Sequence, residues 1–319
     1  MRRLKVGELF AGVGGISTGF TNAGFDVVWA NECDAKACVT YRTNFKHKMI
    51  EEDMRKINPD DLEKIDILTG GFPCQAFSIA GYRKGFDDDR GNLFFEILRF
   101  IDSHNPEVVF LENVKNLANH NKGRTFKRIL EELKNRNYYT KYKVLNTCEY
   151  SAIPQNRERI YIVAFKNSKH FDSFEFPKPM RETMTIKDIL EKKVDEYYYY
   201  NKTRYYERLS QEMKKPFTIY QWRRVYLREN KSGVCPTLTA NMGTGGHNVP
   251  LVRDSKDIRK LTPRECFRLQ GFPESFKFPE KMPKSALYKQ AGNSVSVPVI
   301  ERIAINIKKA IDSDLLLVN

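Results

Sequence analysis

Residues 4–15 read LKVGELFAGVGG, an apolar run that gives way to a glycine-rich loop. The run 4–10 predicts a β-strand, and a helical pattern begins at residue 15. Glycines at such a strand-to-helix turn let the backbone come close to a ligand and leave the first N–H groups of the helix free. The stretch therefore indicates an α/β fold whose ligand sits beyond the carboxyl ends of the strands.

The same alternation of short apolar runs and helical patterns continues through the first 165 residues. It predicts a parallel α/β sheet with helices on both faces. The expected strands are 4–10, 27–31, 65–69, 108–112 and 159–165, and the expected helices are 15–23, 34–44, 93–104 and 122–136. Residues 181–260 read as a smaller, loop-rich, partly β domain. Helical texture returns from residue 261 and ends in an amphipathic stretch over 297–311.

The chain is basic, with a formal net charge of +14 over 319 residues. Residues 181–260 hold 17 Lys and Arg against 10 Asp and Glu, which places half of the excess in a quarter of the chain. Such a balance favours a polyanionic partner. The alternative interpretation is that a basic surface only keeps the protein in solution.

Six cysteines are scattered without a CxxC pair or companion histidines, which argues against a disulfide framework or a metal site. No apolar run approaches the roughly 18–20 residues that span a bilayer, and the N-terminus lacks a signal-peptide pattern. We therefore expect a cytoplasmic protein with free thiols, one of which can serve as a nucleophile.

Residues 70–78 read GGFPCQAFS and follow the apolar run 65–68. Proline lacks an N–H and fixes φ, and glycine permits tight backbone, so together they end the strand and place Cys74 in a loop. This position suits a reactive thiol. The alternative interpretation is a buried or incidental cysteine.

Two acidic residues follow later strands. Glu32 stands 17 residues after Gly15 at the end of the second strand, where a carboxylate suits the ribose hydroxyls of a nucleoside cofactor. Asp53 is placed to accept from an adenine amino group. Because the glycine spacing is not GxGxxG, a mononucleoside cofactor such as S-adenosylmethionine is favoured over a dinucleotide. A plain tight turn with surface acids is the alternative.

Glu112 closes the apolar strand 108–111 near the predicted thiol loop. Desolvation there favours the protonated carboxyl, which can then donate a proton, although a helix-capping acid would look the same. Residues 155–159 read QNRER. Arg157 and Arg159 are two apart on a predicted strand, so we expect them to point the same way, toward a shared anion or base. A surface ion-pair ladder is the alternative.

Taken in order, these motifs resemble those of the bacterial DNA (cytosine-5)-methyltransferases of type II restriction–modification systems, over nearly the whole chain. The matching elements are FAGVGG at 10–15, NE at 31–32, Asp53, GFPCQ at 71–75, ENV at 112–114, QNRER at 155–159, LTPREC at 261–266 and QAGNSV at 290–295. The resemblance implies a Rossmann-like methyltransferase core with a mixed, mostly parallel sheet over 1–175. It also implies a target-recognition domain over 176–260 and a segment over 261–319 that packs back on the catalytic domain.

The resemblance also implies roles. Cys74 attacks C6 of cytosine, Glu112 holds or protonates N3, Arg159 braces the base, and Arg157 assists. The residues implied for the S-adenosylmethionine pocket are Phe10, Gly12, Gly14, Gly15, Glu32, Asp53, Pro73, Asn293, Ser294 and Val295.

A thiol cannot reach C6 of a stacked base, so the target must be flipped out of the duplex. We expect residues 75–93 to form a mobile loop that closes over DNA. The residues expected to contact DNA are Gln75, Ser78, Arg83, Lys84, Arg90, Arg223, Arg224, Arg228, Lys231 and Thr237. The expected partner is duplex DNA, with a monomeric enzyme that needs no protein partner and is functionally paired with a restriction endonuclease.

Other classes stay open at this point. A tRNA cytosine methyltransferase would use the same chemistry on another polyanion. An NAD(P)-dependent oxidoreductase would explain the glycine loop and Glu32, but not Cys74 or the basic domain. A catalytically inactive DNA-binding regulator would not need Cys74 and Glu112.

Overall fold

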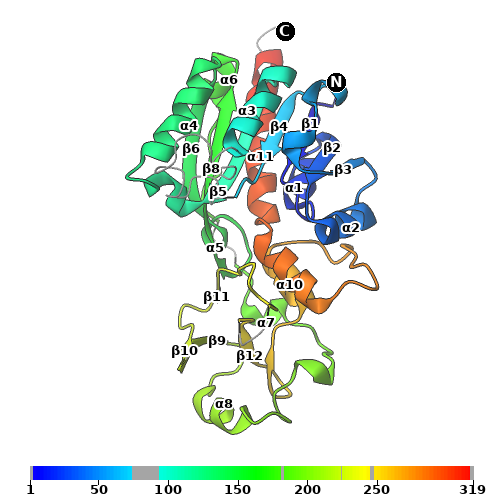
Figure 1. Ribbon diagram of the computed structural model, residues 1–319. Helices are drawn as coiled ribbons and strands as arrows, with labels where there is room; N and C mark the ends of the chain where they lie inside the picture. The colour runs from blue at the N-terminus through cyan, green and yellow to red at the C-terminus, as the bar shows by residue number, and fades with distance from the viewer. Residues whose placement is uncertain (1–2, 74–92, 181–182, 224, 245–247, 317–319) are drawn as a thin grey trace. The chain divides into compact units, whose positions relative to one another are not determined.

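The structure is a computed structural model that describes residues 3–73, 93–180, 183–223, 225–244 and 248–316 (Figure 1). Backbone contacts divide the chain into two compact units. The α/β unit comprises Met1–Leu145, Glu158–Lys178 and Pro298–Asn319, and the second unit comprises Asn146–Arg157 and Pro179–Val297. Among the described residues, no helix combines the length and the apolar character needed to cross a membrane.

A seven-stranded mixed sheet forms the centre of the α/β unit. Its strands, in spatial order, are β3 (Lys48–Glu51), β2 (Asp26–Glu32), β1 (Lys5–Leu9), β4 (Ile67–Gly70), β5 (Val108–Val114), β8 (Glu158–Phe165) and β6 (Tyr139–Asn146). Neighbours from β3 to β5 pair in parallel, whereas β8 pairs antiparallel with β5. The expected mixed, mostly parallel sheet is therefore confirmed, as are all five predicted strands.

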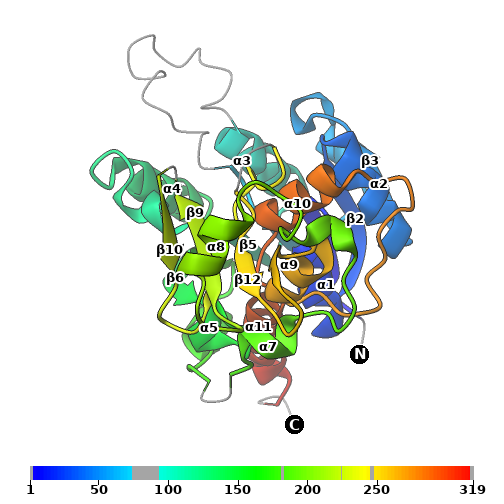
Figure 2. The same cartoon turned by 90° about the horizontal axis from the view of Figure 1, so that it is seen from below.

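Helices cover both faces of this sheet (Figures 1 and 2). On one face, α3 (Leu93–His104) and α4 (Arg124–Asn135) bury apolar side chains against Val109 and Leu111 of β5. On the other face, α1 (Gly15–Asn22) packs Phe20 against Phe110, with ring centroids 5.3 Å apart. Two more helices lie on that face, α2 (Ala35–Asn44), whose Tyr41 packs with Ala30, and α11 (Val297–Leu316), beside α1. The alternating side chains of β5 thus divide the core into two layers.

Short elements connect these layers. The 3₁₀ helices are η1 (Met54–Lys56), η2 (Pro59–Asp61) and η5 (Lys115–Asn119), and α6 (Ser168–Ser173) follows β8. Helix α2 begins at a residue that suits a helix start, because the Asp34 carboxylate accepts from the backbone N–H groups of Lys36 and Ala37 at 3.0 and 3.2 Å. The four predicted helices all form.

The second unit is loop-rich and partly β, as expected. Its antiparallel sheet has the order β10 (Tyr226–Glu229), β9 (Ile219–Arg223), β12 (Leu251–Arg253) and β13 (Ile258–Lys260). A short parallel pair joins β7 (Gln155–Asn156) to β11 (Cys235–Pro236). Its helices are α5 (Thr147–Tyr150), α7 (Ile186–Ile189), η6 (Glu196–Tyr198), α8 (Tyr206–Glu212), α9 (Pro263–Leu269) and α10 (Lys284–Asn293).

The C-terminal part of the chain is shared between the units. Residues 261–297 belong to the second unit, whereas α11 from Pro298 onward belongs to the α/β unit. Within the second unit, the Arg259 guanidinium on β13 lies 2.7 Å from the Glu265 carboxylate on α9, and both side chains are fully buried. The expected functional boundaries at 175 and 260 remain predictions.

Candidate active site

The glycine loop after β1 follows an unusual backbone path. Phe10, Gly12 and Gly14 all have positive φ, at 56°, 56° and 87°. Gly14 has no room for a side chain, because an added Cβ would lie 2.2 Å from the Phe45 ring. Gly12 is different, because an added Cβ would meet nothing within 4 Å. The backbone at Gly12 is therefore open to a ligand.

The Glu32 side chain at the end of β2 ties the glycine loop to the next strand. Its Oε2 accepts from the Gly12 N–H at 2.9 Å, and its Oε1 accepts from the N–H groups of Cys33 and Asp34, each at 2.8 Å. The structure thus brings two predicted cofactor elements into direct contact. The remaining acceptor capacity of this carboxylate fits the hydroxyls of a ribose.

Asp53 lies next to this strand end. The Asn31 side-chain amide on β2 donates to the carbonyls of Ile50 and Glu52, immediately before Asp53, at 3.0 and 2.8 Å. Hydrogen bonds from Arg55 hold the pKa of Asp53 at about 2, so the carboxylate is ionised at neutral pH. Burial raises the pKa of the Cys33 thiol, and the charges of Glu32 and Asp53 raise it further. The pKa of Cys33 therefore depends on the charges of both predicted cofactor carboxylates.

The ends of β4 and β5 meet beside the predicted thiol loop. The Asn113 side chain donates to the Phe72 carbonyl at 2.8 Å, and a Cβ added to Gly71 would lie 3.5 Å from Glu112 Oε2. Pro73 follows and is exposed. The predicted Cys74, Gln75, Ser78, Arg83, Lys84 and Arg90 lie outside the described residues. The chain thus approaches Cys74 from a point next to the Glu112 carboxylate.

Glu112 and Arg159 form a largely buried ion pair across β5 and β8. Arg159 Nε lies 3.1 Å from Glu112 Oε1, and the two side chains are 13% and 8% exposed. The antiparallel register places Glu112 opposite Tyr161 and Val114 opposite Arg159, so the pair is diagonal across the ladder. Glu112 lies within β5 and caps no helix. A carboxylate oriented by a guanidinium at a sheet end is suited to hold a proton on a substrate ring.

Arg157 behaves differently from Arg159, and the expectation that both arginines point toward one anion is wrong. Arg157 lies between β7 and β8, is 2% exposed, and belongs to the second unit. Its guanidinium donates to the carbonyls of Leu238 at 3.0 Å, Gly292 at 3.4 Å and Ser294. The Arg157 guanidinium therefore binds three backbone carbonyls, whereas the strand periodicity had predicted that it would point toward a ligand.

The predicted cofactor residues Asn293, Ser294 and Val295 also lie in the second unit, at the end of α10. Asn293 is exposed, whereas Ser294 and Val295 are buried. Gly292 is required where two segments cross, because an added Cβ would lie 2.1 Å from the Thr239 carbonyl oxygen.

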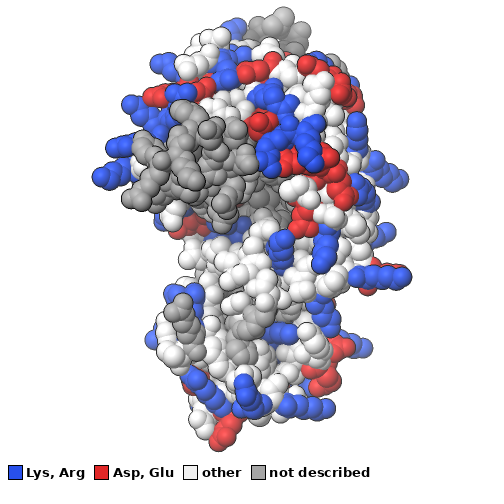
Figure 3. All heavy atoms as spheres, viewed as in Figure 1, with Lys and Arg blue, Asp and Glu red and all other residues white. Residues whose placement is uncertain are grey.

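The predicted DNA contacts of the second unit fall on two elements. Arg223 and Arg228 share the exposed face of the β9–β10 ribbon, while Trp222 and Leu227 point the other way and pack on the core of this unit. Thr237 instead donates its hydroxyl to the Asn156 carbonyl at 2.7 Å. Lys231 is exposed, and Arg224 lies outside the described residues. In Figure 3, Lys and Arg side chains are spread over the visible face rather than gathered in one patch.

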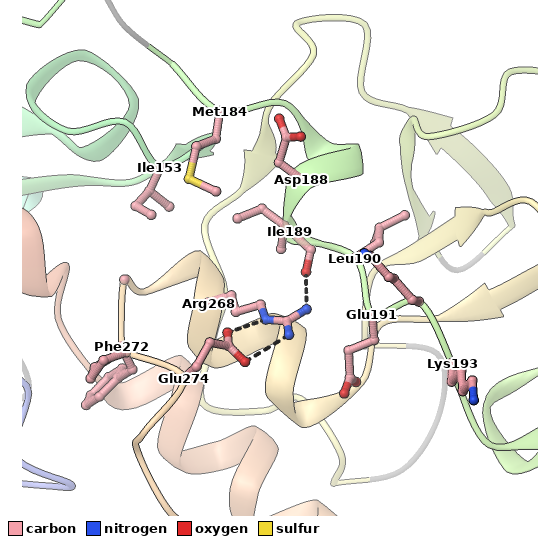
Figure 4. Close-up of a pocket in the computed structure, with 13 residues that line it drawn as sticks. Ile153, Met184, Asp188, Ile189, Leu190, Glu191, Lys193, Arg268, Phe272 and Glu274 are labelled. Carbon is pink, nitrogen blue, oxygen red and sulfur yellow. Dashed lines mark hydrogen bonds and ion pairs between the residues drawn. The ribbon is translucent and has the colours of Figure 1, made fainter.

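A cavity of about 760 Å³ lies within the second unit (Figure 4). Inside it the Arg268 guanidinium donates to both carboxylate oxygens of Glu274, at 2.6 and 2.9 Å, and to the Ile189 carbonyl at 2.9 Å. None of its lining residues is a predicted site residue. Because the charge of Arg268 is already paired with the Glu274 carboxylate, the cavity does not offer an unpaired cation to an anionic ligand.

The sequence reasoning missed Glu8, a buried carboxyl on β1 next to the glycine loop. It is 1% exposed, and burial raises its pKa to about 8. Its Oε2 accepts from Ser17, while Oε1 has no hydrogen-bond partner among the described residues. The available signal was an acidic residue inside the apolar run 4–10.

The sheet order, the glycine loop after β1 and the acidic residue after β2 define the class of Rossmann-like, S-adenosylmethionine-dependent methyltransferases. Residues 4–309 match the family described as C-5 cytosine-specific DNA methylase. The chain belongs to this family and is a bacterial type II DNA (cytosine-5)-methyltransferase. The oxidoreductase interpretation is thereby excluded.

Individual relatives agree with this assignment. The type II methyltransferase M.Bsp6I of Bacillus sp. (strain RFL6) is 58% identical over 313 residues, covering 96% of this chain and 99% of the relative. M.HhaI of Haemophilus parahaemolyticus is 38% identical, with 97% and 95% covered. Among solved structures, S. pombe Dnmt2 methyltransferase superposes with a TM-score of 0.74 at 22% identity, covering 98% of this chain and 99% of that one. At this identity the superposition supports the fold alone.

Proposed function

We propose that the enzyme methylates C5 of a cytosine flipped out of a short duplex sequence, through a transient bond between Cys74 Sγ and C6 of the base. The observation that carries this proposal is the Glu112–Arg159 pair, which lies where the chain leaves β4 toward Cys74. A thiol nucleophile and an oriented carboxylate are the two groups that the reaction needs.

The chemistry explains why both groups are needed. C5 of cytosine is a weak nucleophile. When the Cys74 thiolate forms a bond to C6, the C5–C6 π electrons move into the ring and make C5 enamine-like. Glu112 holds the proton at N3 that neutralises the charge, and Arg159 keeps the Glu112 carboxyl in place. After methylation, a solvent base takes the C5 proton, the C5–H electron pair restores the C5–C6 double bond, and the C6–S bond breaks to release the Cys74 thiolate.

S-adenosylmethionine, when bound, supplies the electrophilic methyl group. The glycine loop fits this cofactor, because the open face of Gly12 admits a ligand to the backbone and Glu32 keeps acceptor capacity for a ribose. Asp53, whose carboxylate is ionised and paired with Arg55, is the acceptor that we assign to the adenine amino group. Phe10, Gly14, Gly15, Pro73 and the residues Asn293, Ser294 and Val295 complete the proposed set.

We propose duplex DNA as the substrate and residues 176–260 as the part that reads it. The face of the β9–β10 ribbon that carries Arg223 and Arg228 offers guanidinium groups to phosphates or to guanine edges. Residues 75–92, which were expected to form a loop over the flipped base, lie outside the described residues. The packing of the ribbon supports this proposal. Its opposite face is held against the core of the second unit, so the face with the two arginines is turned toward solvent, where DNA can contact it.

We also infer a cellular role: a cytoplasmic, monomeric enzyme that protects host DNA from a partner endonuclease. The type II relatives support this role by their names. Bisulfite sequencing of DNA from cells that express the protein tests the function. One short sequence should be methylated at one cytosine with the parent protein, and none with a Cys74→Ser variant. Methylation by both proteins, or by neither, would overturn the proposal.

A further inference from the structure

A buried chain of hydrogen bonds runs beneath the glycine loop. Ser17 Oγ donates to Glu8 Oε2, and the Ser17 N–H donates to the same oxygen at 3.0 Å. Ser17 Oγ lies 2.6 Å from the Tyr41 hydroxyl, which lies 2.5 Å from His47 Nε2. The first three side chains are buried, and His47 is half-buried. The chain therefore links the interior of the site to a group near the surface.

The donors in this chain can be assigned. When Ser17 gives its one hydroxyl proton to Glu8 Oε2, the Tyr41 hydroxyl donates to Ser17 Oγ. Tyr41 also has one proton, so its oxygen must accept from His47 Nε2. The arrangement requires a His47 tautomer with a proton on Nε2. All the donors point inward, toward Glu8.

The hydrogen-bond chain contacts the segments on both sides of the glycine loop. Glu8 precedes the loop on β1, and Ser17 follows it in the first turn of α1. The Tyr41 ring also packs under the loop, where a Cβ on Gly14 would lie 3.0 Å from it. Hydrogen bonds between Glu8 and Ser17 therefore fix the two ends of a loop that has three residues at positive φ.

We propose that Tyr41 and His47 are positioning residues for the cofactor, which act through Ser17 and Glu8 to hold the glycine loop in its binding conformation. The inference rests on the proposed function, because it needs the loop to bind S-adenosylmethionine. Neither residue belongs to the predicted site. A loop held in place before binding loses less conformational entropy when the ligand arrives.

Burial favours the uncharged forms of Glu8, Tyr41 and His47. Burial lowers the pKa of His47, against the raising effect of Asp26, and burial raises the pKa of Tyr41 well above its usual value. Burial raises the pKa of Glu8 to about 8, and the Glu32 charge adds to that rise. The hydrogen bonds that position the glycine loop are therefore made by uncharged side chains.

A Tyr41→Phe variant tests the inference, because it removes only the hydroxyl and keeps the ring beside Gly14. We expect the Kd and KM for S-adenosylmethionine to rise about tenfold, since Ser17 and His47 each lose a buried partner, while kcat changes less than about twofold. Tyr138→Phe is the matched control. Tyr138 is also buried in the same unit and donates to the Pro106 carbonyl at 2.6 Å, so this variant should bind the cofactor like the parent.

His47 provides a second, independent test. His47→Ala removes the donor to Tyr41 and should weaken cofactor binding several-fold, whereas His47→Gln keeps an N–H donor and should restore most of the affinity. Because His47 is only half-buried, both variants should fold. Equal binding by the two variants would contradict the inference.

A Glu32→Ala variant separates this inference from the proposed function. If Glu32→Ala weakens cofactor binding and Tyr41→Phe does not, the cofactor site stands and the positioning role is wrong. If neither variant changes binding, the glycine loop is not the cofactor site and both proposals fail. If Tyr41→Phe and Tyr138→Phe weaken binding equally, the effect is general destabilisation and the positioning role is again wrong.

Discussion

Arg159 Nε lies 3.1 Å from Glu112 Oε1, so two residues from antiparallel neighbouring strands form one largely buried unit at the end of the sheet. Their close approach follows from the diagonal register of β5 and β8. Because both charges are largely removed from water, each is stabilised by the other, and loss of either side chain leaves the remaining charge buried without a partner.

Replacing Glu112 with Gln should lower kcat by about 10²–10⁴, because the amide cannot hold a proton at N3 of the base. Single-turnover methylation of duplex DNA measures this change. Glu158→Gln is the control, since that carboxylate on β8 pairs with Lys115 at the surface and should be dispensable. Near-parental kcat in the Glu112 variant would contradict the assigned role.

Replacing Arg159 with Leu should lower the free energy of unfolding by about 3 kcal/mol, because the Glu112 charge stays buried without its partner. Urea denaturation followed by circular dichroism provides the measurement. The double variant with Glu112→Gln should recover part of the loss, since the amide is uncharged. Additive losses would argue against coupling of the pair.

Gly12→Ala should bind the cofactor at least tenfold more weakly while it stays folded. The backbone strain of alanine at φ 56° costs about 1–2 kcal/mol, and the added Cβ meets no protein atom within 4 Å. Gly233→Ala is matched in both respects, with φ 74° and open space around the added Cβ. Calorimetry with S-adenosylmethionine should separate the two variants, and equal affinities would remove Gly12 from the cofactor site.

Glu8 should make stability depend on pH. Its pKa is about 8 in the folded protein against 4.5 for the unfolded group, so the folded state holds one more proton between these values. The contribution of Glu8 to stability is present below pH 4.5 and declines by up to about 1.4 kcal/mol per unit until pH 8. Glu8→Gln should flatten this decline in unfolding curves from pH 5 to 8. An unchanged slope would mean that Glu8 is already ionised in the fold.

Arg223→Ala and Arg228→Ala should each weaken DNA binding and lower the slope of log K against log salt by about 1 if the arginine contacts a phosphate. If it reads guanine, site preference should relax instead. Lys202→Ala removes an exposed charge from the same unit, outside the predicted set, and serves as the control. Binding isotherms at several salt concentrations measure the effect, and parental behaviour of both arginine variants would exclude this face of the ribbon.

The interior of the α/β unit was predictable because its strands are continuous apolar runs. The two sheet edges were harder. β6 exposes Tyr139 and Tyr142 and alternates them with lysines, and β3 has only four residues, none of them buried. An edge strand buries too little surface to leave a clear hydrophobic pattern.

The candidate site was also predictable only in part. Glu32 and Glu112 were found because each stands at the end of a strand predicted from the sequence. Arg157 was misread because its carbonyl partners come from residues 238, 292 and 294, which no local pattern connects to it. The hydrogen-bond chain through Tyr41 was equally hidden, since Glu8 and His47 are linked only through Ser17 and Tyr41, which tertiary packing brings together.

The bond between Cys74 and the base can be tested directly by trapping. A duplex with 5-fluorocytosine at the methylated position, incubated with the enzyme and S-adenosylmethionine, should give a complex that survives denaturing electrophoresis, with the mass of the base on the peptide that contains Cys74. Fluorine cannot leave C5 as a proton does, so the Cys74 bond cannot break. Absence of that complex, or parental methylation rates from Cys74→Ser, would contradict the account.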